Sequence, residues 1–201
     1  PTPDEPTIDP STLKFGDRID NKATVVGIFE SSDLGKVVFA VLDSSYWSNK
    51  KWSSGLMGID IELPKYGNDA DVINDKKSAT YNTDYVLTNY SDKATEAFTF
   101  CRNIEPLNFN GKTYNCQLPN ACELSNFHDV IDMFYPFDSA YSEDISLDEW
   151  LFGADYDHGL WTSNIKDASK AWAELYDCTS TLSKDSEQRV IPIIEIPLKE
   201  V

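Results

Sequence analysis

The sequence predicts an α+β domain in which a twisted antiparallel sheet packs against two helices and carries long loops. Three observations predict it: a β-rich hairpin pattern near the N-terminus, two capped helical segments in mid-chain, and strand-like runs over the last third. With 201 residues, of which 41% are hydrophobic and 12% aromatic, the chain is long enough to bury a sizeable core. We therefore expect a linker over residues 1–12 and one domain over residues 13–201.

Residues 1–12 have the composition of a flexible linker. Four of the first ten residues are proline, which favours an extended, poorly packed chain. Because such linkers often follow a cleaved signal or a lipid-anchored cysteine, we expect an exported, lipid-anchored precursor and an extracellular or cell-surface location. No apolar run approaches the roughly 20 residues of a membrane-spanning helix, so we expect no membrane insertion of this chain.

Two runs near the N-terminus predict an antiparallel hairpin. Residues 23–29 and 36–42 are rich in β-branched and aromatic side chains, and the loop between them contains Gly35. From residue 44 to about residue 90 the periodicity fades among Ser, Asn, Asp, Gly and Lys. We expect a long loop there, and loops of that length in compact domains are often functional.

Two helices are predicted in the middle of the chain, joined through a turn over residues 108–111. Ser91 or Asp92 can cap the first helix, which carries apolar residues as far as Cys101. The second helix is expected after Pro119, because Asn120 and Glu123 have the spacing of a capping box. Its predicted buried face consists of Leu124, Phe127, Val130, Ile131 and Phe134.

The last third of the chain is predicted to hold a short capped turn and then strands. Ser146 and Glu149 have capping-box spacing for the turn. The strands are expected at residues 159–163, 171–176 and 189–196. Period-two alternation in the second strand predicts that Trp172, Glu174 and Tyr176 share one face. Pro192 restricts the last strand to a sheet edge or a bulge.

The order of short motifs in the second half of the chain resembles a known family. These motifs are Leu118-Pro119 before the capped helix with Glu123-Leu124, then Leu160-Trp161-Thr162-Ser163, Ala171-Trp172, and Val190-Ile191-Pro192-Ile193. Together they resemble a C-type-lectin-like domain, and more specifically the C-terminal domain family of the Legionella collagen-like adhesin and the Fibrobacter major paralogous domains. The resemblance implies a lectin-like fold with two helices and long loops, and fold alone does not imply sugar binding.

The chain departs from that family at three of the motif positions. Gln117 stands where the family usually has Arg, Thr162 where it has Ser, and Ile191 where it has the Arg before proline. The family motifs look structural, since their tryptophans and prolines pack the helix and the closing strands. The departures keep the apolar scaffold and remove two charges, so the resemblance carries the fold further than the function.

Charge excludes some partners and raises the question of calcium. The formal net charge of −17 argues against nucleic acid and anionic membranes, which need clustered Lys and Arg. Between Lys112 and Lys166 lie ten Asp or Glu residues and no Lys or Arg. A Ca²⁺ site would take oxygen ligands from five of them: Asp138, Glu143, Asp144, Asp155 and Asp157. The favoured alternative is a solvated acidic face, because no ligand-spacing motif is present.

Four aromatic residues of the predicted long loop are the candidate ligand contacts. Tyr46, Trp47, Trp52 and Tyr66 could form a platform for a glycan or a peptide, because Trp and Tyr combine contact area with a polar group. The favoured alternative is that they cover the core of the hairpin. His158 could join two neighbouring acids in a site, although an ordinary turn is the better interpretation of its surroundings.

The four cysteines leave two interpretations open. Cys101, Cys116, Cys122 and Cys178 allow two disulfides in an oxidising compartment, and a short Cys116–Cys122 bridge is one of the pairings. Buried free thiols are an equal alternative, because cysteine behaves as a small hydrophobic residue.

These observations predict an exported bacterial surface module that recognises a glycan or a surface protein of a host or bacterium, adhesin-like and without catalysis. No Gly-x-Ser-x-Gly or similar context supports a nucleophilic enzyme. One alternative is an exported glycan-processing enzyme that uses a metal or a carboxylate pair in the acidic region 138–157. Another is a structural subunit of a surface assembly, whose edge strand over residues 190–196 pairs with a neighbour.

Overall fold

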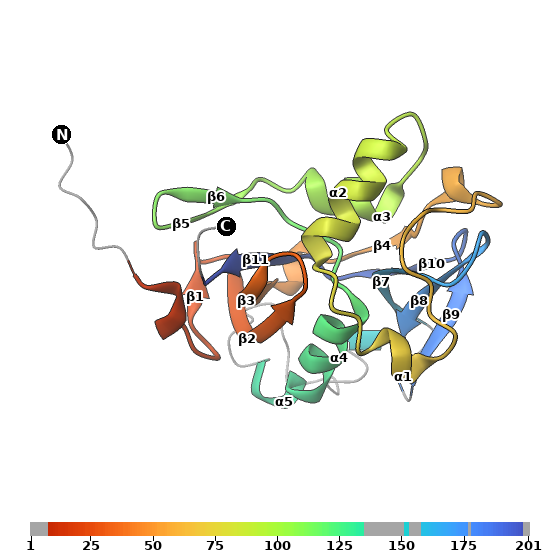
Figure 1. The fold of residues 1–201 in the computed structure, drawn as a ribbon. Coiled ribbons are helices and arrows are strands. Elements are labelled where there is room, and N and C mark those ends of the chain that lie inside the picture. The colour runs from red at the N-terminus through yellow and green to blue at the C-terminus, as the bar shows by residue number, and fades with distance from the viewer. Residues whose placement is uncertain (1–7, 135–150, 153–157, 177, 199–201) are drawn as a thin grey trace.

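The computed structural model describes residues 8–134, 151–152, 158–176 and 178–198. These residues form mixed helices and sheets, and most strand pairs are antiparallel (Figure 1). The predicted α+β class is therefore confirmed. No helix in the described ranges is long and apolar enough to cross a membrane.

The first sheet contains the predicted hairpin and the last strand of the chain. Its strands, in spatial order, are β1 (Arg18–Ile19), β2 (Ala23–Ser31), β3 (Gly35–Leu42) and β11 (Ile193–Pro197). β2 and β3 pair antiparallel, with a bulge between Val25 and Gly27. The hairpin prediction is confirmed, and β11 closes the sheet by pairing with β3.

The second sheet is assembled from segments far apart in the sequence. Its strands, in spatial order, are β4 (Ser48–Lys51), β10 (Glu187–Val190), β7 (Leu160–Ile165), β8 (Lys170–Glu174) and β9 (Thr179–Ser183). The alternation predicted for β8 is confirmed as far as its end at Glu174, because Ala171 and Ala173 belong to the main core cluster and Trp172 to a separate one. Residues 171–174 are nevertheless all buried. Helix α4 (Ala121–Asp129) contacts β7 and β8, and Ala171 and Ala173 belong to the main core, so both faces of the strand are covered.

The single strand predicted over residues 189–196 is in fact two strands in different sheets. β10 and β11 are separated by Ile191 and Pro192, and the chain crosses from the second sheet to the first there. Val190 lies inside the second sheet, because β10 has β4 on one side and β7 on the other. At the start of β11, Gln117 exchanges two backbone hydrogen bonds with Ile193, at 2.8 and 3.1 Å, on the side away from β3.

Both predicted helices are present. The first is α3 (Glu96–Arg102), which begins after Thr95 and so later than predicted. The second is α4, in which Asn120 and Glu123 form the predicted capping box and Leu124 and Phe127 are buried. α4 ends at Asp129, and a short α5 (Ile131–Phe134) follows. The turn predicted from Ser146 and Glu149 lies outside the described residues.

The predicted long loop over residues 44–90 is instead largely structured. It contains η2 (Ser44–Tyr46), β4, η3 (Ser54–Leu56), α1 (Asp69–Val72) and α2 (Ala79–Asn89). α2 was missed because its buried face includes Asn82 and Thr83 beside Ala79 and Val86, and this polar content hides the helical periodicity.

The helices cover the sheets from opposite sides. In Figure 1, α2 and α3 lie above the strands and α4 and α5 below them. The hairpin of β5 (Leu107–Phe109) and β6 (Lys112–Tyr114) extends beside β11, and the 3-10 helix η1 (Pro10–Thr12) lies at the N-terminal end. This arrangement leaves β4 and β9 as the outer strands of the second sheet.

Candidate functional site

A shallow depression beside strand β4 of the second sheet is a candidate site for a small ligand. Its volume is about 380 Å³, and it is lined by Ser44, Trp47, Ser48, Asn49 and Arg189. The lining combines one large aromatic ring with hydroxyl, amide and guanidinium groups. One aromatic surface flanked by hydrogen-bonding groups can contact both the apolar and the polar parts of a ligand.

Strand pairing brings the depression together. The chain leaves β3, turns through η2 and enters β4, which places residues 44–49 in succession along one rim. β10 pairs antiparallel with β4, so that Arg189 is directly opposite Asn49 and Val190 is opposite Ser48. Side chains at such directly paired positions are close neighbours. Arg189 therefore joins the site from 140 residues away in the sequence.

The indole ring of Trp47 is held in place from two directions. Its Nε1 donates a hydrogen bond to the carbonyl oxygen of Leu42 at 2.8 Å. The ring also meets Phe127 of α4 edge to face, with 6.3 Å between the ring centroids. Trp47 is half-buried, and its orientation is fixed by these two contacts before any ligand arrives.

The polar side chains of the depression have partners at its rim. Arg189 donates to the carbonyl oxygen of Leu151 at 2.6 Å. Asn49 Nδ2 lies 3.1 Å from His158 Nε2, so His158 stands beside the depression. The sequence raised His158 as a site candidate together with Asp155 and Asp157, and those two acids lie outside the described residues.

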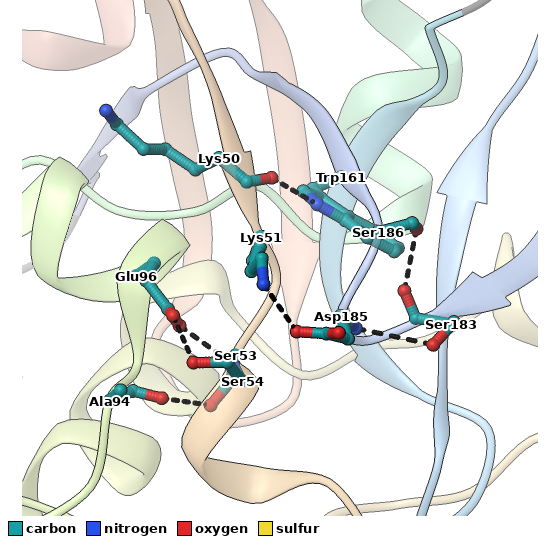
Figure 2. A network of polar contacts seen from close by, with 10 residues as sticks. All are labelled: Lys50, Lys51, Ser53, Ser54, Ala94, Glu96, Trp161, Ser183, Asp185 and Ser186. Atoms are coloured by element: carbon teal, nitrogen blue, oxygen red, sulfur yellow. Dashed lines mark hydrogen bonds and ion pairs between the residues drawn. The ribbon is translucent and has the colours of Figure 1, made fainter.

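A network of polar contacts braces the end of β4 and the residues that follow it (Figure 2). Lys51 pairs with Asp185, in the turn between β9 and β10, at 2.7 Å. The indole of Trp161 donates to the carbonyl oxygen of Lys50 at 2.9 Å. Just after β4, the carboxylate of Glu96 accepts from both the backbone N–H and the hydroxyl of Ser54. These contacts join β4 to α3 and to the other strands of the second sheet.

The connection between β4 and α3 requires glycine at position 55. A Cβ placed on Gly55 would lie 2.4 Å from the backbone nitrogen of Ala94. At this close approach the Ala94 carbonyl oxygen accepts hydrogen bonds from Gly55 N at 3.0 Å and from Ser53 Oγ at 2.5 Å. A side chain here would separate the two backbones.

The four aromatic residues predicted to form one platform are separated in the structure. Trp52 is fully buried, packs edge to face on Phe98, and donates to the carbonyl oxygen of Thr162 at 2.8 Å. Tyr46 packs against the same core cluster as Trp52, and Trp47 packs against a second cluster. Tyr66 packs in a third. Burial and a hydrogen bond to Asp75 raise the pKa of Tyr66. Of the four, only Trp47 lines the depression.

The other sequence candidates are placed as follows. The acids proposed to bind calcium, Asp138, Glu143, Asp144, Asp155 and Asp157, all lie outside the described residues. Among the residues that are described, no three His, Cys, Asp or Glu side chains are grouped as a metal site. Cys101, Cys116 and Cys122 carry free thiols, so the Cys116–Cys122 bridge is not formed. Burial raises the pKa of the Cys116 thiol to about 12.

A second concentration of polar groups, which the sequence did not reveal, lies inside the protein. The carboxyl groups of Glu123 on α4 and Glu195 on β11 contact each other, and their residues are 0% and 4% exposed. Glu195 accepts hydrogen bonds from the backbone N–H groups of Ala79 (3.2 Å) and Thr80 (2.7 Å), at the start of α2. Glu123 accepts from the backbone N–H of Asn120 at 2.9 Å.

We infer that these two carboxyl groups share a proton, because two adjacent buried carboxylates would repel each other. Burial raises the pKa of Glu123 well above its ordinary value, and the neighbouring Glu195 raises it further. Burial also raises the pKa of Glu195, although its hydrogen bonds oppose the shift. Glu123 Oε1 is a buried atom without a hydrogen-bond partner among the described residues, and a proton shared with Glu195 would satisfy it. Both residues are closed off from solvent, so the pair is a structural link and offers a glycan no access.

Neither group of polar residues is predictable from the sequence, because in both cases tertiary packing brings distant residues together. Ser44, Ser48 and Asn49 lie in an uninformative polar stretch, and Arg189 meets them only through strand pairing. Glu195 lies between Ile194 and Ile196 in an otherwise apolar run. A charged residue in such a run was the one sequence signal of a buried carboxyl group. No family model, no curated protein and no solved structure matches this chain.

Proposed function

We propose that this chain is a non-catalytic recognition module that binds a glycan in the depression at Trp47. The proposal includes a C-type-lectin-like fold and display on a bacterial surface, which follow from the sequence resemblance and the proline-rich N-terminal segment. One observation carries the choice of site: a pre-oriented Trp ring lies beside Ser, Asn and Arg side chains in a single depression.

The chemistry of the lining favours a saccharide over a purely apolar ligand. A sugar presents C–H groups on the face of its ring and hydroxyl groups around the edge. Trp47 offers the aromatic surface, and Ser44, Ser48, Asn49 and Arg189 offer hydrogen-bonding groups around it. Because Trp47 and β4 are already braced, binding would cost little ordering of the protein.

The arrangement of the sheets is compatible with the proposed lectin-like fold. The N-terminal hairpin and the C-terminal strand share the first sheet, and the capped helix α4 packs against both sheets. The second sheet carries the depression on its outer strand β4, next to a connecting segment. The resemblance places recognition in such connections, and Ser44 and Trp47 belong to one.

A glycan array with the full chain tests the proposal, followed by titration of any glycan that binds. We expect Trp47→Ala and Asn49→Ala each to weaken binding at least tenfold, because a well-placed aromatic or polar contact contributes about 1.4 kcal/mol or more. The matched control is Tyr81→Ala, which removes a partly exposed aromatic residue of α2 that does not line the depression. That variant should bind as the wild type does.

Two results would contradict the proposal. A wild-type chain that binds no glycan on the array would remove the ligand class. Undiminished binding by both Trp47→Ala and Asn49→Ala, with melting curves showing that they are folded, would remove the depression as the contact.

A further inference from the structure

At Ile8, where the described part of the chain begins, one side chain of the β5–β6 hairpin holds the backbone. The carboxamide of Asn110 accepts a hydrogen bond from the backbone N–H of Ile8 at 2.9 Å and donates one to the carbonyl oxygen of the same residue at 2.5 Å. Ile8 itself is 51% exposed, so packing of its side chain contributes little to this attachment. The paired bonds also fix which atom of the amide is oxygen and which is nitrogen.

Asn110 occupies a turn with unusual covalent reactivity. Asn110 and Gly111 form the two-residue turn between β5 and β6, with φ of 54° and 72°, as a type I′ turn requires. This is the only Asn-Gly step in the sequence. A Cβ added at Gly111 would meet no atom within 4 Å, so the space beside the Gly111 Cα is open, and glycine places no side chain next to its own backbone nitrogen.

We propose that Asn110 is a site of spontaneous deamidation, and that the reaction loosens the N-terminal segment from the β5–β6 hairpin. The backbone nitrogen of Gly111 attacks Cγ of Asn110, the Cγ–Nδ2 bond breaks, and the nitrogen leaves as ammonia with the proton from Gly111. The product is a cyclic imide. Water then adds to one of its two carbonyl carbons and reopens the ring, which gives aspartate or isoaspartate; no oxidant or reductant is needed.

The contact with Ile8 favours the first step of this reaction. The N–H of Ile8 points at the amide oxygen of Asn110, where negative charge develops when the Gly111 nitrogen attacks. A hydrogen-bond donor already aimed at such an oxygen stabilises the transition state. The carboxamide of Asn110 therefore both holds Ile8 in place and is made more reactive toward the Gly111 nitrogen by Ile8.

The product can no longer hold the segment in the same way. Aspartate has two acceptor oxygens and no donor, so the Ile8 carbonyl oxygen loses its partner and faces a second oxygen, and the resulting repulsion pushes Ile8, with its N–H, away from the turn. Isoaspartate adds an atom to the backbone and disrupts the type I′ turn as well. The adjoining pocket, which is lined by Ile8, Asp9, Tyr114 and Leu198 among others, would open as the segment moves away.

Peptide mapping by mass spectrometry tests the reaction. We expect the folded full chain, kept in mildly alkaline buffer at body temperature, to gain one dalton at Asn110 and not at Asn108. Asn108 is an exposed asparagine of the same hairpin, followed by Phe109, and is the internal control. Aspartate can adopt the left-handed conformation of the turn, but its side chain hinders attack by the backbone nitrogen of residue 111. In the Gly111→Asp variant, the rate of mass gain at Asn110 should therefore be lower than in the wild type. Equal rates at Asn110 and Asn108 in the folded chain would overturn the site.

Hydrogen exchange tests the consequence. Asn110→Asp imitates the product, and we expect the amide of Ile8 to exchange about fivefold faster in it than in the wild type, corresponding to the loss of about one net hydrogen bond. Amides of β2 and β3 should exchange at the wild-type rate, which excludes general unfolding. An unchanged rate at Ile8 would overturn the proposed release of the segment.

Discussion

The depression at Trp47 and the carboxyl pair of Glu123 and Glu195 both gather polar groups, but under opposite conditions. The depression is open to solvent. Its side chains come from β4, from β10 and from the segment that connects β3 to β4. The carboxyl pair is closed off from solvent, and it joins α2, α4 and β11 in the interior. A group of polar side chains is therefore not by itself a binding site, because the same kind of group can also join buried elements. Access to solvent separates the two roles.

The largest expected effect is on the closed side of this comparison. Glu195→Ala should lower the free energy of unfolding by about 3–5 kcal/mol, because it leaves the N–H groups of Ala79 and Thr80 and the carboxyl of Glu123 buried without their partner. Chemical denaturation measures this loss. Glu195→Gln keeps the size and one acceptor oxygen, so its loss should be smaller. If the Glu195→Ala variant unfolds at the same denaturant concentration as the wild type, the carboxyl pair does not hold α2, α4 and β11 together.

The next effect is a dependence of stability on pH. The pKa of Glu123 is raised above 4.5 in the folded protein, so the folded chain holds a proton that the unfolded chain releases. Stability contributed by this group is therefore complete below pH 4.5 and falls as pH rises from there through the raised pKa, by up to about 1.4 kcal/mol per pH unit.

Glu123→Gln isolates this dependence. Glutamine keeps the acceptor for Asn120 and places a permanent N–H donor toward Glu195, so no proton is required. We expect the variant to be more stable than the wild type at neutral and alkaline pH, with the difference growing as pH rises. Melting curves of both proteins across that range measure it, and other groups cancel in the difference. A difference that does not change with pH would contradict the shared proton.

The smallest effect is expected on the open side. Asn49→Ala should change the free energy of unfolding by no more than about 0.5 kcal/mol, because Asn49 is exposed and lies on an outer strand. The same variant should bind glycan at least tenfold more weakly than the wild type. A stability loss comparable to that of Glu195→Ala would mean that the depression is part of the scaffold, and the contrast between the two regions would disappear.

The elements with strong local signals were predictable from the sequence. The β2–β3 hairpin and the capping box of α4 depend on neighbouring residues, and both were found as expected. α2 was not predicted, because its buried face contains polar residues such as Asn82. The side chain of Asn82 donates a hydrogen bond to Ser163 Oγ at 3.1 Å. Likewise Pro192 signalled an interruption, but nothing local indicated that the chain changes sheets there.

The candidate site was less predictable than the fold. Trp47 was a candidate, but Trp52, only five residues further on, is core, and no local pattern distinguishes the two. The two rings differ in burial because different segments pack against them. Trp52 packs edge to face on Phe98 of α3, whereas Trp47 packs edge to face on Phe127 of α4. Arg189 is recruited only by the pairing of β10 with β4, which sequence spacing does not specify.

The shared pocket of Ile8 and Leu198 has a topological consequence. Because one pocket is lined by both residues, the two ends of the described fold lie side by side. A short flexible bridge could join them, and new termini could then be opened in an exposed turn such as the one at Gly35, where an added Cβ meets no atom within 4 Å. The domain is thus suited to circular permutation, and it could be inserted as a cassette into a loop of another protein without spreading that loop apart.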